Sequence, residues 1–337
     1  MLALLLQHLP TEEYTHYIIY FHDGPYKDYC DKNCIKSYHI TGLICSYDPF
    51  FCLRLIKLIY QLKPDRIHAM LWAANMLGRL IGTILRIPVI SALHALPQHE
   101  GAVRTILGRL MPQPTLYCAV SRSIKECQQR AHSTAIIIIP NGIEIAPEHN
   151  PIHIDKNSFV IGSVGRFVPV KNYHMLLTSF SEIYRQHPHS NLILIGHGPL
   201  EQKLRAYARA LEIDHAVTFI INEPAAEYYH MFDCFVQCSD YEGLSMALLE
   251  AMSNKISVIA TGNNNTHDVI EHEHDGIIIP PGNQEALTIA LKRYLINPDL
   301  RSLYAQRGYD KCIAQYTVTT MCKSYDDVFK NMHKIIA

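Results

Sequence analysis

The sequence predicts an α/β protein with two doubly wound parallel-sheet domains, one in each half of the chain. Three observations carry this prediction. At 337 residues the chain exceeds the size of one typical core. Short apolar runs alternate with segments whose apolar residues recur every three or four positions, as in a parallel sheet covered by helices. The alternation stops at a polar, proline-containing segment, 146–158, and then begins again.

The first half contains five strand candidates and three amphipathic helix candidates. The strands are expected at 17–21, 66–71, 88–93, 116–120 and 135–140, and the helices at 51–63, 73–85 and 121–131. We expect residues 1–145 to form the first domain and 146–158 to be a linker.

The second half repeats the pattern. Strands are expected at 159–167, 191–196, 216–221, 234–239, 256–261 and 276–281, and helices at 172–187, 200–211, 225–232 and from about Ser245. Residues 159–316 would form the second domain. A helix at 317–337 would then pack back toward the first. Ligands of doubly wound domains bind at the carboxyl ends of strands, so candidate side chains are sought there.

Composition excludes several classes of protein. A net charge of −1 argues against a nucleic-acid binder, and no stretch reaches about 18 uninterrupted apolar residues. The ten cysteines fall mostly in apolar runs, as in reduced cytoplasmic proteins. A histidine-rich stretch, 267–276, lacks repeated metal-ligand spacing, and we expect no metal site.

A cationic site is expected at the start of the second domain. Gly165 and Arg166 end a predicted strand, and Lys171 follows just before a helix. Two cations beside a helix N-terminus suit a dense anion such as a diphosphate. The alternative is a pair of solvated cations on a surface loop.

Two further segments lie at predicted strand ends. Gly196 and Gly198 bracket His197, and glycines there let a ligand approach the backbone, although such a pair also makes ordinary turns. In EGLSMALLEAM, Glu242 lies on a loop before a helix that Ser245 would cap. Glu250 lies inside that helix, where a carboxylate could reach back to accept hydrogen bonds from a vicinal diol.

In this order, the segments GRFVPVKN, LILIGHGP and EGLSMALLEAM resemble the nucleotide-sugar glycosyltransferases of family 4, the group 1 type of the GT-B fold. The E-x7-E signature of that family corresponds to Glu242 and Glu250. The first half agrees, with KPDRIHAMLWAANMLGRL, PVISALHAL, CAVSRSIKE and IIPNGIEI. The resemblance covers nearly the whole chain and implies two Rossmann-like domains facing a central cleft, with the acceptor on the first and the donor on the second.

The resemblance also implies roles for single residues. Arg166 and Lys171 would hold the donor diphosphate, and Gly165, Gly196 and Gly198 would belong to the substrate-binding site. Glu242 would contact the transferred sugar. The amides of Gly243, Leu244 and Ser245 would contact the sugar and phosphate, and Glu250 would bind the ribose hydroxyls. His94 would lie near the reacting sugar, and Asn141 and Gly142 would form a turn at the domain crossing. The family is similar to retaining enzymes that need neither metal nor cofactor.

Two departures from the family pattern stand out. MLALLLQHL corresponds to the first helix of such a domain, so the strand and Gly-rich loop that precede this helix in relatives are missing from residues 1–145. Asn264 and Asn265 stand where relatives often have a glycine pair, and Asp268 takes the place of the acid. Both departures weaken the inference of donor identity and full activity.

The leading hypothesis is a retaining transferase that moves a hexose-type sugar to a saccharide or lipid-linked acceptor in cell-surface polysaccharide or glycolipid synthesis. The alternatives are an inactive nucleotide-binding partner or scaffold of another transferase, and a sugar-nucleotide epimerase, which the E-x7-E spacing disfavours. We expect a cytoplasmic protein. Basic amphipathic segments at 51–63 and 103–111 leave open a peripheral contact with anionic membrane.

Overall fold

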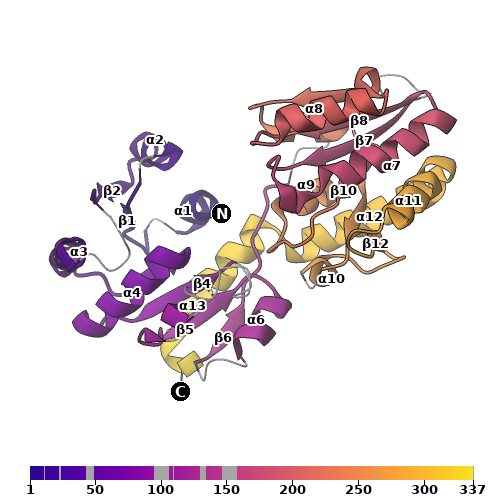
Figure 1. Ribbon diagram of the computed structural model, residues 1–337. Helices are drawn as coiled ribbons and strands as arrows, with labels where there is room; N and C mark the ends of the chain where they lie inside the picture. Colours follow the sequence, from indigo (N-terminus) through magenta and orange to yellow (C-terminus); the bar gives the residue numbers. More distant parts are fainter. Residues whose placement is uncertain are drawn as a thin grey trace. The chain divides into compact units, whose positions relative to one another are not determined.

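The chain folds into two compact units, which are described separately. The first comprises residues 1–142 and 318–337, and the second residues 143–317. The computed structural model describes residues 1–10, 12–22, 24–42, 49–94, 106–108, 110–129, 134–145, 158–263 and 265–336 (Figure 1). The predicted linker, 146–158, lies outside these residues except for Ser158.

The second unit is built on one parallel sheet of six strands. These are β7 (Phe159–Val164), β8 (Ser190–Ile195), β9 (Val217–Ile220), β10 (Cys234–Gln237), β11 (Ser257–Thr261) and β12 (Ile277–Ile279). Their spatial order is β12-β11-β10-β7-β8-β9. In chain order, β7, β8 and β9 extend the sheet in one direction, and β10, β11 and β12 then extend it in the other, as in a doubly wound fold. All six predicted strands are confirmed.

Among the described residues of this unit, six α-helices accompany the sheet, and Figure 1 shows their arrangement. They are α7 (Tyr173–Gln186), α8 (Glu201–Ala210), α9 (Met246–Ser253), α10 (Thr266–Val269), α11 (Gln284–Ile296) and α12 (Pro298–Gln315). The segment 173–186 forms α7 because its apolar residues recur at helical spacing and are fully buried against the sheet. These residues are Leu176, Leu177, Phe180 and Ile183.

The first unit contains two parallel sheets. The strands β3 (Ile67–Met70), β4 (Val89–Leu93), β5 (Leu116–Ala119) and β6 (Ile136–Ile138) pair in sequence order, and β1 (Tyr17–Tyr20) pairs with β2 (Lys36–His39). The helices with bounds are α1 (Leu2–His8), α2 (Pro25–Lys32), α3 (Pro49–Leu62), α4 (Trp72–Leu85), α6 (Arg122–Gln129) and α13 (Val318–Ile336).

The chain crosses between the units twice. The crossings fall between Gly142 and Ile143 and between Thr317 and Val318, and Ile143 forms an isolated β-bridge with Thr317. The helix α13 belongs to the first unit, where Tyr325 and Phe329 enter a core shared with α1 and with buried residues of β4 and β5. No helix in the described ranges is long and apolar enough to cross a membrane.

Two observed elements were not predicted, and one predicted element needs correction. The sequence gives no strong signal for α2 and β2, because PYKDYCDK is polar and KSYH has exposed ends. The helix expected at 225–232 is instead two 3₁₀ turns, Ala225–Glu227 and Tyr229–Met231. Tyr229 and Phe232 are both buried there, and a spacing of three places them on one side of a 3₁₀ turn.

A partly buried histidine, whose Nε2 atom is fully enclosed, makes the first unit sensitive to acid. The His68 ring lies 5.1 Å from the ring of Tyr325, centre to centre, and its Nε2 atom has no hydrogen-bond partner among the described residues. Burial lowers the pKa of His68 to about 4, with the neighbouring His94 contributing. Between about pH 6.5 and pH 4, His68 is therefore neutral in the folded chain and protonated in the unfolded chain.

We expect the free energy of unfolding of this unit to decrease as pH falls from about 6.5 to 4, by up to ~1.4 kcal/mol per pH unit for each such histidine. His68→Phe should reduce this slope by the contribution of one histidine, up to ~1.4 kcal/mol per pH unit. Urea unfolding can be followed by the fluorescence of Trp72, the single tryptophan of the chain, which begins α4 in the same unit. Equal slopes for the wild type and the variant would contradict the assignment.

Candidate functional site

The site lies where the order of the six-stranded sheet reverses. The strands β7 and β10 are neighbours there, with Cys234 opposite Ile161 and Phe235 opposite Gly162. In doubly wound folds the connections that leave such neighbouring strands run to opposite sides of the sheet, and ligands bind at this point. The loops after β7, β8 and β10 therefore supply the candidate residues.

Three glycines make close backbone packing possible at this edge. A Cβ atom on Gly196 would lie 2.1 Å from the carbonyl oxygen of Gly165, and one on Gly198 would lie 2.6 Å from that of Phe167. Gly165 has φ +156° and Gly196 has φ +148°, in the region that favours glycine. The loops after β7 and β8 can therefore lie against each other only with glycine at these positions.

Lys171 is brought over the end of β7. It ends a 3₁₀ turn, Pro169–Lys171, and its Nζ atom would lie 3.4 Å from a Cβ atom on Gly165. The ammonium group forms an ion pair with Oε1 of Glu242. Ser239, just after β10, donates a second hydrogen bond of 2.8 Å to the same oxygen. Gly165, Lys171 and Glu242 thus converge as the sequence motifs suggested, although the motifs did not predict the ion pair.

Arg166 differs from Lys171 in its surroundings. Its side chain is exposed, and no ion pair to it is formed within the described part of the chain. His197, between the two glycines of the next loop, is also exposed. Both side chains are therefore free to turn toward a ligand at the same edge of the sheet.

The loop that carries Glu242 leads into α9. Ser245 caps this helix as predicted, accepting a hydrogen bond of 3.3 Å from the amide of Leu248 and donating one to Gln237. The residues before the cap, Gly243 and Leu244, lie between Glu242 and the helix N-terminus, where the dipole favours negative charge.

Asn265 accounts for one departure of the sequence from the family pattern. This buried side chain donates a hydrogen bond of 2.6 Å from Nδ2 to the backbone carbonyl of Glu242. A glycine could not make this contact, so the asparagine anchors the Glu242 loop from the side of α10. Asn264 lies outside the described residues.

Glu250 lies on α9, and its carboxylate is held by a tyrosine. The Tyr229 hydroxyl donates a hydrogen bond of 2.7 Å to Oε2 of Glu250. Burial raises the pKa of Tyr229 well above its usual value, and the charge and hydrogen bond of Glu250 raise it further. This phenol therefore stays protonated and can only donate to the carboxylate.

Tyr173 is a neutral phenol at the same edge of the sheet. Its hydroxyl donates to the carbonyl oxygen of Gly165 at 3.1 Å. Burial raises the pKa of Tyr173, and the negative charge of Glu242 contributes to the increase. Tyr173 in turn contributes to the raised pKa of Tyr229. Glu242, Tyr173, Tyr229 and Glu250 thus belong to one neighbourhood, although no direct contact joins the two carboxylates in the described hydrogen bonds.

His94 belongs to the other unit. It directly follows β4, and burial lowers its pKa to about 4, so the ring is neutral near pH 7. Its Nε2 atom is buried and has no hydrogen-bond partner in the described ranges. Asn141 is also buried, and the amide of Gly142 contacts the sulfur of Met321 at 3.1 Å, at the crossing out of this unit.

Sequence reasoning missed four side chains that hold the site together: Ser239, Tyr173, Tyr229 and Asn265. Asn265 was noticed only as a departure. The tyrosines carried no motif of their own, and the partner of Tyr229 lies 21 residues away in the sequence.

Comparison with known proteins agrees with this geometry. The family model described as "Glycosyltransferase Family 4" matches residues 1–146, and the model described as "Glycosyl transferases group 1" matches residues 144–311. A galactosyltransferase of Escherichia coli, UDP-Gal:alpha-D-GlcNAc-diphosphoundecaprenol alpha-1,3-galactosyltransferase, is 21% identical over 96% of this chain and 91% of its own length.

Other relatives are similar over different shares of their length. An uncharacterized glycosyltransferase of Haemophilus influenzae is 26% identical over 51% of this chain, which spans only 49% of that relative. The crystal structure of Anabaena HepE in complex with UDP superposes with a TM-score of 0.82, at 18% identity, over 98% of this chain and 96% of that one. At this identity the similarity shows the fold.

The two family models together match residues 1–311, and the solved structure shares the fold of both α/β domains. Lys171 and Glu242, from two of the matching segments, form an ion pair at the switch point of the second sheet. The chain belongs to the group 1 glycosyltransferases of family 4 and has the GT-B fold.

Proposed function

We propose that this glycosyltransferase moves a hexose-type sugar, with retention of configuration, from a nucleotide-sugar donor to a saccharide or lipid-linked acceptor. The observation that carries the proposal is the convergence of Lys171, Gly165 and Glu242 at the switch point of the second sheet. The activities named for relatives support it. They include a galactosyltransferase acting on a diphosphoundecaprenol-linked sugar and a glycosyltransferase of lipopolysaccharide core biosynthesis from Rhizobium meliloti.

The ion pair indicates how a donor would bind. Lys171 and Glu242 are each about four fifths buried, with side-chain exposures of 19% and 18%. A donor diphosphate carries more charge than one carboxylate and would compete with Glu242 for the ammonium group. Arg166 and the N-terminus of α9 would add positive character. Glu242 would then be released toward the sugar hydroxyls.

The chemistry follows from the charge that develops on the leaving group. Departure of a nucleoside diphosphate leaves negative charge on the phosphate oxygens, which Lys171 and Arg166 would stabilise. The ribose hydroxyls would be held by Glu250, and neutral His94 would lie near the reacting sugar. We do not assign a nucleophilic role to Glu242, whose Oε1 atom also accepts a hydrogen bond from Ser239.

Activity is tested by incubating the chain with a panel of nucleotide sugars and an extract of saccharide and lipid acceptors. Acceptor-dependent release of nucleoside diphosphate is expected, and NMR of the product would show the anomeric configuration. Binding without any release would favour the alternative, an inactive nucleotide-binding scaffold.

We expect Lys171→Ala and Glu250→Ala each to reduce kcat/KM by about 10²–10³-fold, because each removes a charged group that holds the donor. Steady-state kinetics measures the effect, and circular dichroism verifies the fold. Lys203→Ala is the control, since Lys203 is exposed on α8 in the same unit and carries the same charge. Turnover and donor affinity at wild-type values in both variants would show that the site assignment is wrong.

We also propose that transfer needs no metal ion, because the fixed cations and the helix N-terminus supply the positive charge. Activity should be unchanged, within about twofold, after dialysis against EDTA, since no step loses its electrostatic stabilisation. The assay is the same release of nucleoside diphosphate. Loss of activity in EDTA that is restored by Mg²⁺ or Mn²⁺ would refute this proposal.

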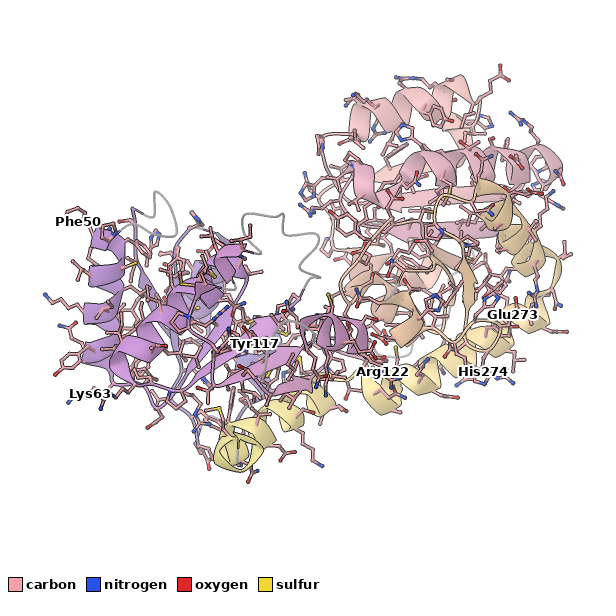
Figure 2. The ribbon with its side chains drawn as sticks, turned by 60° about the horizontal axis from the view of Figure 1, so that its bottom comes forward. Phe50, Lys63, Tyr117, Arg122, Glu273 and His274 are labelled. Atoms are coloured by element: carbon pink, nitrogen blue, oxygen red, sulfur yellow. The ribbon has the colours of Figure 1, made fainter. Side chains whose placement is uncertain are left out.

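A contact with anionic membrane is proposed for the outer face of α3. One side of this helix is buried through Phe51, Leu55 and Ile59, as expected for a helix that covers a sheet. The other side exposes Phe50 at 76%, Leu53 at 63% and Tyr60 at 67%. Figure 2 labels Phe50 and Lys63, which mark the two ends of the helix.

Cations accompany these apolar residues. Arg54, Lys57 and Lys63 are all exposed on or directly after α3. Apolar and aromatic side chains interspersed with lysine and arginine are typical of helices that lie in the interface of an anionic bilayer. Arg104 and Arg109, in the second basic segment, lie outside the described residues.

We expect the chain to co-sediment with anionic phospholipid vesicles at low salt and to be released as salt rises. The double variant Phe50→Ser/Leu53→Ser should bind at least about tenfold more weakly, because burial of each side chain contributes ~1.5–3 kcal/mol. Ile289→Ser, at a residue 59% exposed in the other unit, is the matched control. Equal recovery of the wild type in the supernatant with neutral and anionic vesicles would contradict the contact.

A further inference from the structure

The phenol of Tyr229 is directed at one oxygen of the Glu250 carboxylate. Tyr229 is 1% exposed, and its hydroxyl lies 2.7 Å from Oε2 of Glu250 and 3.3 Å from the carbonyl oxygen of Ala247. A hydroxyl donates one proton, and the shorter contact to a charged acceptor is the stronger. The phenol therefore donates its hydrogen bond to the Glu250 carboxylate.

The tyrosine ring has little freedom to turn away. It lies in the 3₁₀ turn Tyr229–Met231 and meets the ring of Phe232 edge to face at 5.8 Å. Phe232 in turn covers Gly162 of β7, where a Cβ atom would lie 2.2 Å from the Phe232 ring. The Tyr229 hydroxyl is thus fixed relative to the central strand of the sheet.

In this arrangement the two carboxylate oxygens of Glu250 differ in their hydrogen bonds. Oε2 accepts from Tyr229, and no hydrogen bond to Oε1 is formed among the described residues. A glutamate side chain on a helix has three rotatable bonds, and holding one oxygen fixes the direction of the other. The carboxylate plane is therefore set before any ligand arrives.

We propose that Tyr229 is a positioning residue that orients Glu250 to accept both hydroxyls of a ribose diol, and that it thereby sets the preference for ribonucleotides over 2′-deoxyribonucleotides. The inference rests on the proposed function, in which Glu250 holds the ribose. Oε1 accepts from one ribose hydroxyl, and the second lone pair of Oε2 accepts from the other. Without the phenol the carboxylate rotates and no longer presents both oxygens to the diol.

The test compares the full-length wild type with Tyr229→Phe, which removes one oxygen and keeps the ring. Calorimetry measures the Kd of the diphosphate that binds tightest among UDP, GDP and ADP, then of its 2′-deoxy form and of the corresponding monophosphate. Tyr229→Phe should weaken binding of the ribonucleotide about tenfold, the loss typical of one hydrogen bond to a charged group. Its ratio of ribose to deoxyribose affinity should approach one, while the ratio of diphosphate to monophosphate affinity should not change.

Tyr304→Phe is the matched control. Tyr304 is a buried tyrosine of the same unit whose hydroxyl donates to a different glutamate, Glu273, at 3.1 Å. Removing the Tyr304 hydroxyl eliminates a comparable hydrogen bond and should leave both affinity ratios at wild-type values. A general loss of stability would affect both variants, whereas a loss of ribose preference should be specific to Tyr229→Phe.

The outcomes separate this inference from the proposed function. Glu250→Gln should also lose ribose preference, and adding Tyr229→Phe to it should cause no further loss, because the phenol acts through the carboxylate. If Tyr229→Phe keeps the wild-type ratio while Glu250→Gln loses it, the positioning role is overturned and the ribose site stands. If Glu250→Gln keeps the wild-type ratio as well, both are overturned.

Discussion

The pairing of β7 with β10 is the constraint on which the site depends. The sheet order reverses there, so the connections after these strands run to opposite sides and leave their carboxyl ends open. Lys171 comes from the β7 side and Glu242 from the β10 side, 71 residues later in the chain. Their ion pair therefore depends on the strand order, and neither loop alone would position its charge.

Close packing at the same edge determines which residues the loops can carry. Gly196 lies so near Gly165 that any side chain would overlap its backbone, and the Lys171 side chain passes over Gly165. The glycine motifs are thus explained by contacts between loops as much as by contact with a ligand. A side chain at position 196 would overlap the Gly165 backbone, and one at position 165 would crowd Tyr173 and Lys171.

Much of this could be predicted from the sequence, because the signals are local. The strands of both halves, the helix α9 and its Ser245 cap follow from periodicity and capping preference. The contacts from Tyr229 to Glu250 and from Asn265 to Glu242 could not be predicted, since each joins segments separated by more than 20 residues. The polar strand β2 was missed because its side chains are half exposed and show no apolar pattern.

The two glutamates of the signature are held by different kinds of partner, and this difference suits different tasks. Glu242 is paired with an ammonium group, and an incoming anion can compete for that partner. Glu250 is held by a neutral phenol, which burial keeps protonated and which an anion does not attract. In the proposed function, a donor would displace the first carboxylate while the second keeps its orientation. The ribose end of the proposed site would then be preorganised, and the phosphate and sugar end would rearrange when the charge of the donor arrives.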